Sequence, residues 1–145
     1  MSNPRTKKEY WNERARRGGS PEELVFASSF LKEYEANTRQ FLSMFKDKKV
    51  LDVGCGYGRL SDLFNNYKGI DFSEEMVKLA NERYPDKDIT LGDTHVDNVD
   101  KYDVIFEAMC LSSFDMTPEQ FRDKYKDKAK IIMCLEPNHF SIFYV

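Results

Sequence analysis

Cysteine is scarce in this sequence, and the placement of the few cysteines excludes two common ways of stabilising a small protein. Cys55, Cys110 and Cys134 are odd in number, lie far apart and form no CxxC pair. Disulfide frameworks and structural zinc sites need even-numbered or closely spaced cysteines. We therefore predict reduced thiols, no metal site and a cytoplasmic protein.

Long apolar runs are absent as well. No stretch approaches the roughly 20 apolar residues of a membrane-spanning helix, and residues 1–10 are too polar for a signal peptide. The net charge is −3, and six of the 22 Lys and Arg residues fall within residues 1–20. The rest of the chain is therefore acidic, which argues against a broad nucleic-acid-binding surface.

The apolar content is nevertheless sufficient for a core. With 145 residues, of which 41% are hydrophobic and 14% aromatic, the chain has the size and composition of a folded globular protein. No repeat or linker divides it, so we predict a single domain over residues 1–145.

Short apolar segments alternate with segments of helical periodicity. The expected strands cover residues 50–53, 67–72, 88–91, 101–107, 130–136 and 140–145. The expected helices cover residues 10–17, 20–45, 60–64 and 74–84, and a last helix begins after Thr117. This alternation implies an α/β fold with parallel strands joined by right-handed crossovers. Only three residues separate the last two strands, too few for a crossover, so we predict an antiparallel C-terminal edge strand.

The first strand runs into a glycine-rich turn. Val50, Leu51 and Val53 form the short apolar run that a fully buried parallel strand needs. The glycines at positions 54, 56 and 58 follow, where the backbone can turn sharply and come close to a ligand. A glycine turn between a strand and a helix is typical of the nucleotide-binding end of an open α/β sheet.

Acidic residues stand at the ends of four successive strands. Asp52 enters the glycine turn, Asp71 follows the second strand, Asp93 follows the third and Glu107 ends the fourth. Open α/β sheets bind ligands at this edge. A carboxylate at Asp71 can accept two hydrogen bonds from the hydroxyl groups of a ribose. Each acidic residue alone is also explained as a helix cap or turn residue, but their joint placement favours a nucleoside ligand.

The spacing of the glycines distinguishes between nucleoside ligands. A dinucleotide-binding GxGxxG motif counted from Gly54 requires its third glycine at Arg59, but the third glycine is Gly58. No GxxxxGK[ST] phosphate loop is present. Residues 52–58, Asp-Val-Gly-Cys-Gly-Tyr-Gly, resemble instead the first motif of class I S-adenosylmethionine-dependent methyltransferases.

The resemblance to this family extends through residues 69–73, 92–93 and 102–105 and covers roughly residues 8–137. It implies a Rossmann-like three-layer α/β/α sandwich with strand order 3-2-1-4-5. It implies S-adenosyl-L-methionine as cofactor and S-adenosyl-L-homocysteine as product. It also implies that residues 1–46 form a helical lid or cap.

The resemblance assigns roles to individual residues. Asp71 would hold the ribose, Phe72 would pack on the adenine, and Asp93 would accept a hydrogen bond from the adenine amine. Glu107 and Ala108 would line the cofactor near its sulfonium, and Arg14 in the lid would bind its carboxylate. The full expected cofactor-binding set is Tyr10, Trp11, Arg14, Asp52, Gly54, Cys55, Gly56, Asp71, Phe72, Met76, Asp93, Thr94, Glu107 and Ala108.

The methyl acceptor is less defined. Candidate general bases are Glu107 and His139, with His95 as a further candidate. No Asn/Asp-Pro-Pro-Tyr follows the fourth strand and no Pro-Cys pair is present, which favours a small-molecule acceptor over a nucleic-acid base. The sequence after the fifth strand is short, so the N-terminal helices, residues 110–116 or a second subunit would complete the acceptor site.

Two other hypotheses stay open at this point. The chain could be a non-catalytic S-adenosylmethionine-binding module that needs a partner to complete the acceptor site. It could also be a dehydrogenase, which would bind a nicotinamide cofactor. Because the last strand is apolar and lies at a sheet edge, a homodimer through that edge is a further expectation.

Overall fold

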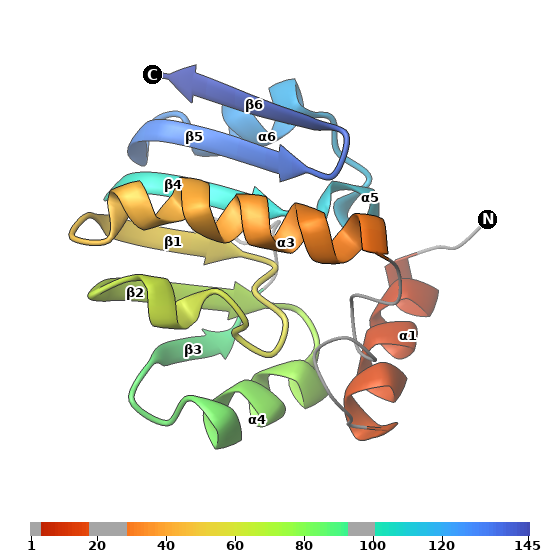
Figure 1. The fold of residues 1–145 in the computed structure, drawn as a ribbon. Coiled ribbons are helices and arrows are strands. Elements are labelled where there is room, and N and C mark those ends of the chain that lie inside the picture. Colours follow the sequence, from red (N-terminus) through yellow and green to blue (C-terminus); the bar gives the residue numbers. More distant parts are fainter. Residues whose placement is uncertain (1–3, 18–28, 93–100) are drawn as a thin grey trace.

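A six-stranded sheet forms the centre of the protein (Figure 1). The computed structural model describes residues 4–17, 29–92 and 101–145. The strand order is β3-β2-β1-β4-β5-β6, with parallel pairing from β3 through β5 and antiparallel pairing of β5 with β6. The predicted strand order and C-terminal hairpin are therefore confirmed. The strands are β1 (Lys49–Val53), β2 (Asn66–Asp71), β3 (Asp88–Leu91), β4 (Tyr102–Ala108), β5 (Ala129–Glu136) and β6 (His139–Tyr144).

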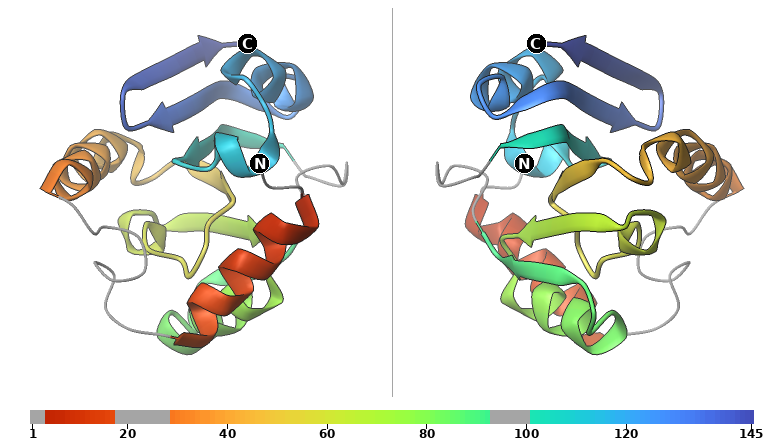
Figure 2. Two further views of the ribbon diagram at one scale, coloured as in Figure 1. Left: turned by 90° about the vertical axis from the view of Figure 1, so that its right-hand side faces the viewer. Right: turned by 90° about the vertical axis from the view of Figure 1, so that its left-hand side faces the viewer.

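Both faces of the sheet are covered by helices (Figure 2). Helix α3 (Ser29–Leu42) lies on one face, and α5 (Leu111–Phe114) and α6 (Pro118–Tyr125) lie on the other. Tyr34, Thr38 and Leu42 recur every four residues and are the buried residues of α3, because this spacing keeps side chains on one side of a helix. Val50, Leu51 and Val53 of β1 are completely buried between the two layers.

Two more helices lie near the carboxyl ends of the parallel strands. Helix α4 (Glu74–Arg83) follows β2 and contacts β2 and β3, and α1 (Pro4–Arg17) packs against α4. Figure 2 shows α1 crossing the edge of the sheet where the parallel strands end. The hydroxyl of Ser73 accepts a hydrogen bond from the backbone N–H of Met76 at 3.1 Å, and Thr117 and Gln120 form a capping box for α6. Both predicted helix starts are confirmed.

The helix predicted directly after the glycine turn is wrong. The structure has a single 3₁₀ turn, η2 (Ser61–Leu63), before Phe64 adopts an extended backbone. Only seven residues separate Gly58 from the first residue of β2, which leaves no room for several helical turns. The apolar spacing has another explanation, since Leu60 and Phe64 are each 1% exposed in the core beside α3.

The N-terminal region differs in extent from the prediction. Helix α1 begins at Pro4 rather than near residue 10, and α3 is described from Ser29 onward. The predicted helix start at residue 20 lies outside the described residues. Within the described residues, no helix combines the length and apolar character needed to span a membrane.

Candidate functional site

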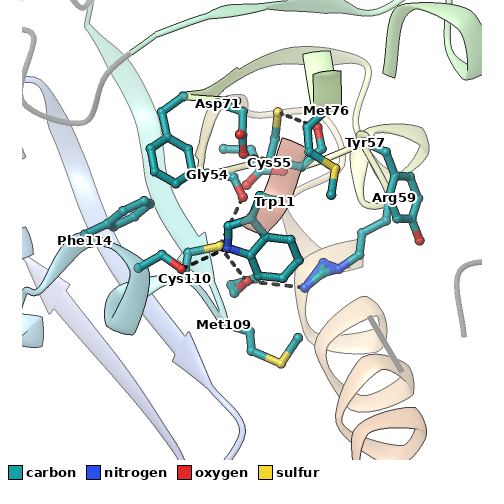
Figure 3. A pocket seen from close by; sticks show the side chains of 15 residues that line it. Trp11, Gly54, Cys55, Tyr57, Arg59, Asp71, Met76, Met109, Cys110 and Phe114 are labelled. Atoms are coloured by element: carbon teal, nitrogen blue, oxygen red, sulfur yellow. Dashed lines mark hydrogen bonds between the residues drawn. The ribbon is translucent and has the colours of Figure 1, made fainter. Parts of the chain in front are cut away.

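A pocket opens at the carboxyl ends of β1, β2 and β4, beneath α1 (Figure 3). Its empty space, part of which is open to solvent, is about 640 Å³. Its walls come from α1, the glycine turn, the start of α4 and the segment after β4. The lining residues are Trp11, Asp52, Gly54, Cys55, Gly56, Tyr57, Arg59, Asp71, Phe72, Met76, Ala108, Met109, Cys110, Ser113 and Phe114.

The structure brings together most of the residues predicted from the sequence. Although they come from four separate parts of the chain, they share this one pocket. The predicted residues that line it are Trp11, Asp52, Gly54, Cys55, Gly56, Asp71, Phe72, Met76 and Ala108.

Other predicted residues lie elsewhere. Tyr10 is 52% exposed and packs edge-on against Trp11, and Arg14 is not among the lining residues. Glu107 is completely buried behind the pocket wall. His139 begins β6, is exposed and does not line the pocket. The remaining candidates, Asp93, Thr94 and His95, lie outside the described residues.

The three glycines of the turn have different structural roles. All three have positive φ, a backbone conformation that favours glycine. A Cβ atom at Gly54 would lie 2.6 Å from Cζ of Phe114, and one at Gly58 would lie 2.8 Å from Cδ1 of Ile89. A Cβ atom at Gly56 would meet no protein atom within 4 Å. Two glycines therefore permit close packing, whereas Gly56 leaves open space on the pocket side.

Asp71 is held in place by two backbone donors. Its Oδ2 accepts a hydrogen bond from the N–H of Gly56 at 2.8 Å, and its Oδ1 accepts one from the N–H of Ser73 at 2.9 Å. Burial raises the pKa of Asp71 to about 6, although these hydrogen bonds stabilise its charged form. The carboxylate is thus fixed at the pocket wall beside the glycine turn.

Asp52 is the second buried carboxyl group of the pocket. The hydroxyl of Tyr67 donates a hydrogen bond to its Oδ2 at 2.8 Å. Burial raises the pKa of Asp52 to about 7, while the Tyr67 hydroxyl and the positive charge of Arg59 favour the carboxylate. Burial therefore raises the pKa of both carboxyl groups of the pocket.

Sequence reasoning missed Arg59 as a pocket residue. Its Nη2 donates to the carbonyl oxygen of Ala108 at 3.3 Å, and its Nη1 lies 3.6 Å from Oε1 of Glu35. The guanidinium thereby joins α3 to the end of β4 and adds a positive charge to the pocket. Its position directly after Gly58 could have indicated this role, because residues of the glycine turn lie beside the pocket.

The segment after β4 closes the opposite wall. Met109 has φ of 65°, an uncommon conformation for a residue other than glycine that often occurs at functional sites. The thiol of Cys110 donates to the carbonyl oxygen of Gly54 at 3.1 Å. The indole N–H of Trp11 donates to the hydroxyl of Ser113 at 3.3 Å. These contacts attach the segment to the glycine turn and to α1.

Glu107 faces a second carboxyl group, that of Glu136, at the end of β5. Its Oε1 accepts a hydrogen bond from the N–H of Cys110 at 2.8 Å. Burial and then the neighbouring Glu136 raise the pKa of Glu107 well above its ordinary value. This pair of carboxyl groups therefore binds a proton more tightly than an isolated glutamate does.

Comparison with known proteins shows the family of the chain. Residues 50–132 match the family described as methyltransferase domain. Protein 235L of Invertebrate iridescent virus 6, a methyltransferase by its name, is 34% identical over 77 residues, which are 48% of this chain. The matched part spans 29% of the length of that curated relative.

Solved structures share the fold at low sequence identity. Magnesium protoporphyrin IX methyltransferase of Synechocystis PCC 6803, solved with bound S-adenosylmethionine, has a TM-score of 0.69 and 19% identity, over 92% of this chain and 76% of that chain. CalS10, an amino pentose methyltransferase from Micromonospora echinaspora, has a TM-score of 0.56 and 19% identity, over 74% and 50% of the two chains.

Proposed function

The chain belongs to the family of methyltransferase domains, and from this membership we propose that it binds S-adenosyl-L-methionine in the pocket and transfers the methyl group to a small molecule. S-adenosyl-L-homocysteine would be the product. The observation that carries the proposal is the open side of Gly56, which faces a cavity bordered by the buried carboxyl groups of Asp52 and Asp71.

The residues present suit such a cofactor. Asp71 is oriented by two backbone N–H groups, and its carboxylate can accept hydrogen bonds from ribose hydroxyl groups. Phe72 and Met76 supply apolar surface for a base beside it. The open side of Gly56 allows a ligand to approach the backbone of the turn.

Among the described residues that line the pocket, the positively charged side chain is that of Arg59, and the predicted Arg14 is not one of these lining residues. A guanidinium suits a carboxylate, because its planar N–H groups match the two carboxylate oxygens. We therefore assign the cofactor carboxylate to the Arg59 side of the pocket and leave Arg14 in the helix above it.

For methyl transfer, the main contribution of the protein is to position the two reactants. S-adenosylmethionine supplies an electrophilic methyl group on a good leaving group. The chain's own residues then orient the two reactants and exclude water, with Trp11 and Phe114 forming apolar walls. Glu107 and His139 remain proposals for a general base, although neither lines the pocket.

A small-molecule acceptor is supported by the kind of protein that shares the fold. The similar structures include methyltransferases named for a magnesium porphyrin, an amino pentose and phosphoethanolamine. The acceptor would enter beside the segment that follows β4, where Met109 and Ser113 line the pocket.

Isothermal titration with S-adenosylhomocysteine tests the cofactor proposal. The wild-type protein is expected to bind it and to show no binding of NAD. Asp71→Ala should weaken binding by about 1–3 kcal/mol, because hydrogen bonds to a charged acceptor are lost. The matched control is Asp127→Ala at an exposed position after α6, which should leave affinity unchanged.

Transfer is tested separately by incubating the protein with S-adenosylmethionine carrying a labelled methyl group and a metabolite extract. Label recovered in a small molecule supports the enzyme. Binding of S-adenosylhomocysteine without any transfer would instead support a non-catalytic module that needs a partner. Binding of NAD in place of S-adenosylhomocysteine would overturn the proposal and favour a dehydrogenase.

A further inference from the structure

The side chain of Asn12 forms hydrogen bonds between α1 and the start of α4. Its amide oxygen accepts hydrogen bonds from the hydroxyl of Ser73 and, at 3.3 Å, from the N–H of Glu75. Its amide N–H donates to the carboxylate of Glu74 at 3.3 Å. The first N–H groups of a helix have no partner within the helix. Asn12 therefore caps α4 from a different helix.

Ser73 connects this contact to the pocket. Its hydroxyl donates to Asn12 and accepts from the N–H of Met76 at 3.1 Å. Its backbone N–H donates to Oδ1 of Asp71 at 2.9 Å, and Oδ2 of Asp71 accepts from Gly56 at 2.8 Å. A continuous chain of hydrogen bonds thus runs from α1 to the glycine turn.

The neighbouring residue attaches α1 to the other side of the pocket. Trp11 lines the pocket and donates to the hydroxyl of Ser113 on α5 at 3.3 Å. Successive side chains of a helix point about 100° apart, so Trp11 and Asn12 reach different walls. Figure 3 shows Trp11 between Met76 and Cys110. Helix α1 therefore bridges the pocket, with Ala15 buried against the side of α4.

Two ion pairs accompany the Asn12 contact. Lys8 Nζ lies 2.6 Å from Oε1 of Glu74, and Nε of Arg16 lies 3.6 Å from Oε1 of Glu75. Both are largely exposed, and exposed ion pairs contribute little. Neither ion pair involves Ser73, whereas Asn12 reaches the Asp71 network through the Ser73 hydroxyl.

We propose that Asn12 is a positioning residue that, through Ser73, holds Asp71 in its ligand-binding orientation and couples docking of α1 to occupation of the pocket. The inference rests on the proposed cofactor site. It assigns to α1 a role beyond covering the pocket. Movement of α1 would break the hydrogen bond between Asn12 and the Ser73 hydroxyl, which orders the start of α4. Lys8 also contacts the start of α4, through its ion pair with Glu74, but this pair does not involve Ser73. Lys8 therefore provides the matched comparison.

The first test measures S-adenosylhomocysteine affinity by isothermal titration in the full chain. Asn12→Ala is expected to weaken binding about tenfold, and Lys8→Ala is expected to change it less than twofold. In a double-mutant cycle, Asn12→Ala and Ser73→Ala should be strongly non-additive, because both break the same chain of bonds. Lys8→Ala and Ser73→Ala should be additive.

The second test uses the single tryptophan of the chain, Trp11, as a reporter of α1 docking. S-adenosylhomocysteine should change its fluorescence in the wild-type protein. In Asn12→Ala the same change should appear only at higher ligand concentration, and stopped-flow measurement should show faster ligand release.

The outcomes separate this inference from the proposed function. Failure of the wild-type protein to bind S-adenosylhomocysteine would overturn the proposed function. If the wild-type protein binds and Asn12→Ala matches Lys8→Ala in affinity, Asn12 has no positioning role. A lower Tm for Asn12→Ala with unchanged affinity and release rate would likewise overturn the inference, since it would show a structural role only.

Discussion

Carboxyl groups are partnered differently at the glycine-turn end of the pocket and behind the pocket wall, where β4 and β5 end. At the glycine-turn end, defined by residues 52–59 and Asp71, the acids accept hydrogen bonds from Tyr67, Gly56 and Ser73. At the β4–β5 end, defined by residues 107–110 and Glu136, two carboxyl groups face each other. Outside this pair, no group of the described residues donates a hydrogen bond to Oε2 of Glu107 or of Glu136.

This difference in hydrogen-bond donors shows at which end the charged form of a carboxyl group is stabilised. Two backbone N–H groups stabilise the charged form of Asp71. Glu107 instead lies against Glu136, and burial followed by this second carboxyl group raises the pKa of Glu107 well above its ordinary value. The glycine-turn end is organised for a ligand that donates hydrogen bonds, whereas the β4–β5 end disfavours the charged form of Glu107.

The largest expected effect compares two glycines of the turn. Gly54→Ala should lower the free energy of unfolding by about 3 kcal/mol, because its Cβ would lie 2.6 Å from Cζ of Phe114 at positive φ. Gly56→Ala should lower it by only about 1 kcal/mol, because its Cβ meets no protein atom. Urea denaturation measures both.

Ligand titration completes this comparison. Gly56→Ala should abolish S-adenosylhomocysteine binding while the protein remains folded, because the added methyl group occupies pocket space. Retained affinity in Gly56→Ala would contradict the placement of the cofactor against the turn.

The next effect concerns the pH dependence of stability. Folding raises the pKa of Asp52 from its ordinary value near 4 to about 7, so the folded state binds this proton more tightly than the unfolded state. The contribution to stability is present at pH 4 and is lost as the pH rises through 7. We therefore compare the free energy of unfolding of Asp52→Asn with that of the wild-type protein. The difference should shift in favour of Asp52→Asn by about 2–4 kcal/mol as the pH rises from 4 to 8.

Parallel urea titrations of the two proteins at several pH values measure this difference. Asp127→Asn, at an exposed position, should show no such pH-dependent gain. A constant difference between Asp52→Asn and the wild-type protein from pH 4 to pH 8 would refute the perturbed titration of Asp52.

A smaller effect is expected at the β4–β5 end. Glu107→Gln removes a group whose raised pKa makes the folded protein less stable as the pH increases. The free energy of unfolding at pH 9 should increase by about 1 kcal/mol relative to the wild-type protein. S-adenosylhomocysteine affinity should change less than twofold. A tenfold loss of affinity would instead place Glu107 in contact with the cofactor.

The smallest effect on stability is expected at the outer edge of the sheet beyond the β4–β5 end. Tyr144 is 81% exposed and Ile142 is 39% exposed on β6, whose outer edge has no partner strand among the described residues. An uncharged edge strand favours pairing with a second copy. Sedimentation should detect a dimer at high concentration, and Tyr144→Lys should abolish it.

The folded monomer should tolerate that substitution, with a change in unfolding free energy within about 0.5 kcal/mol. A wild-type protein that stays monomeric at high concentration would argue against the homodimer. The predicted edge pairing would then have no role in assembly.

Much of the fold was predictable because local signals and the global fold agree. The apolar runs, the short hairpin connection and the caps at Ser73 and Thr117 act over a few residues, and the structure confirms each. The predicted helix after the glycine turn failed because spacing alone cannot show that Leu60 and Phe64 enter the core from a short turn.

The residues of the candidate site likewise include some that the sequence predicts and some that it does not. Residues within or beside the glycine motif, such as Gly56 and Asp71, reach the pocket because strand ends place them there. His139 was chosen only for its position near a strand end, and the hairpin leaves it exposed on β6. Arg59 was missed although it belongs to the motif, because its direction depends on α3 and β4.

By itself the sequence determined the alternation of strands and helices and the glycine turn, since apolar periodicity, glycine conformations and capping are properties of short segments. The strand order was an implication of the family resemblance. The tertiary structure alone decided which side chains meet across the pocket. The contacts of Trp11 with Ser113, of Asn12 with Ser73 and of Glu107 with Glu136 join segments 29 to 102 residues apart. Such pairs carry no local pattern, because their geometry arises only when helices and strands pack together.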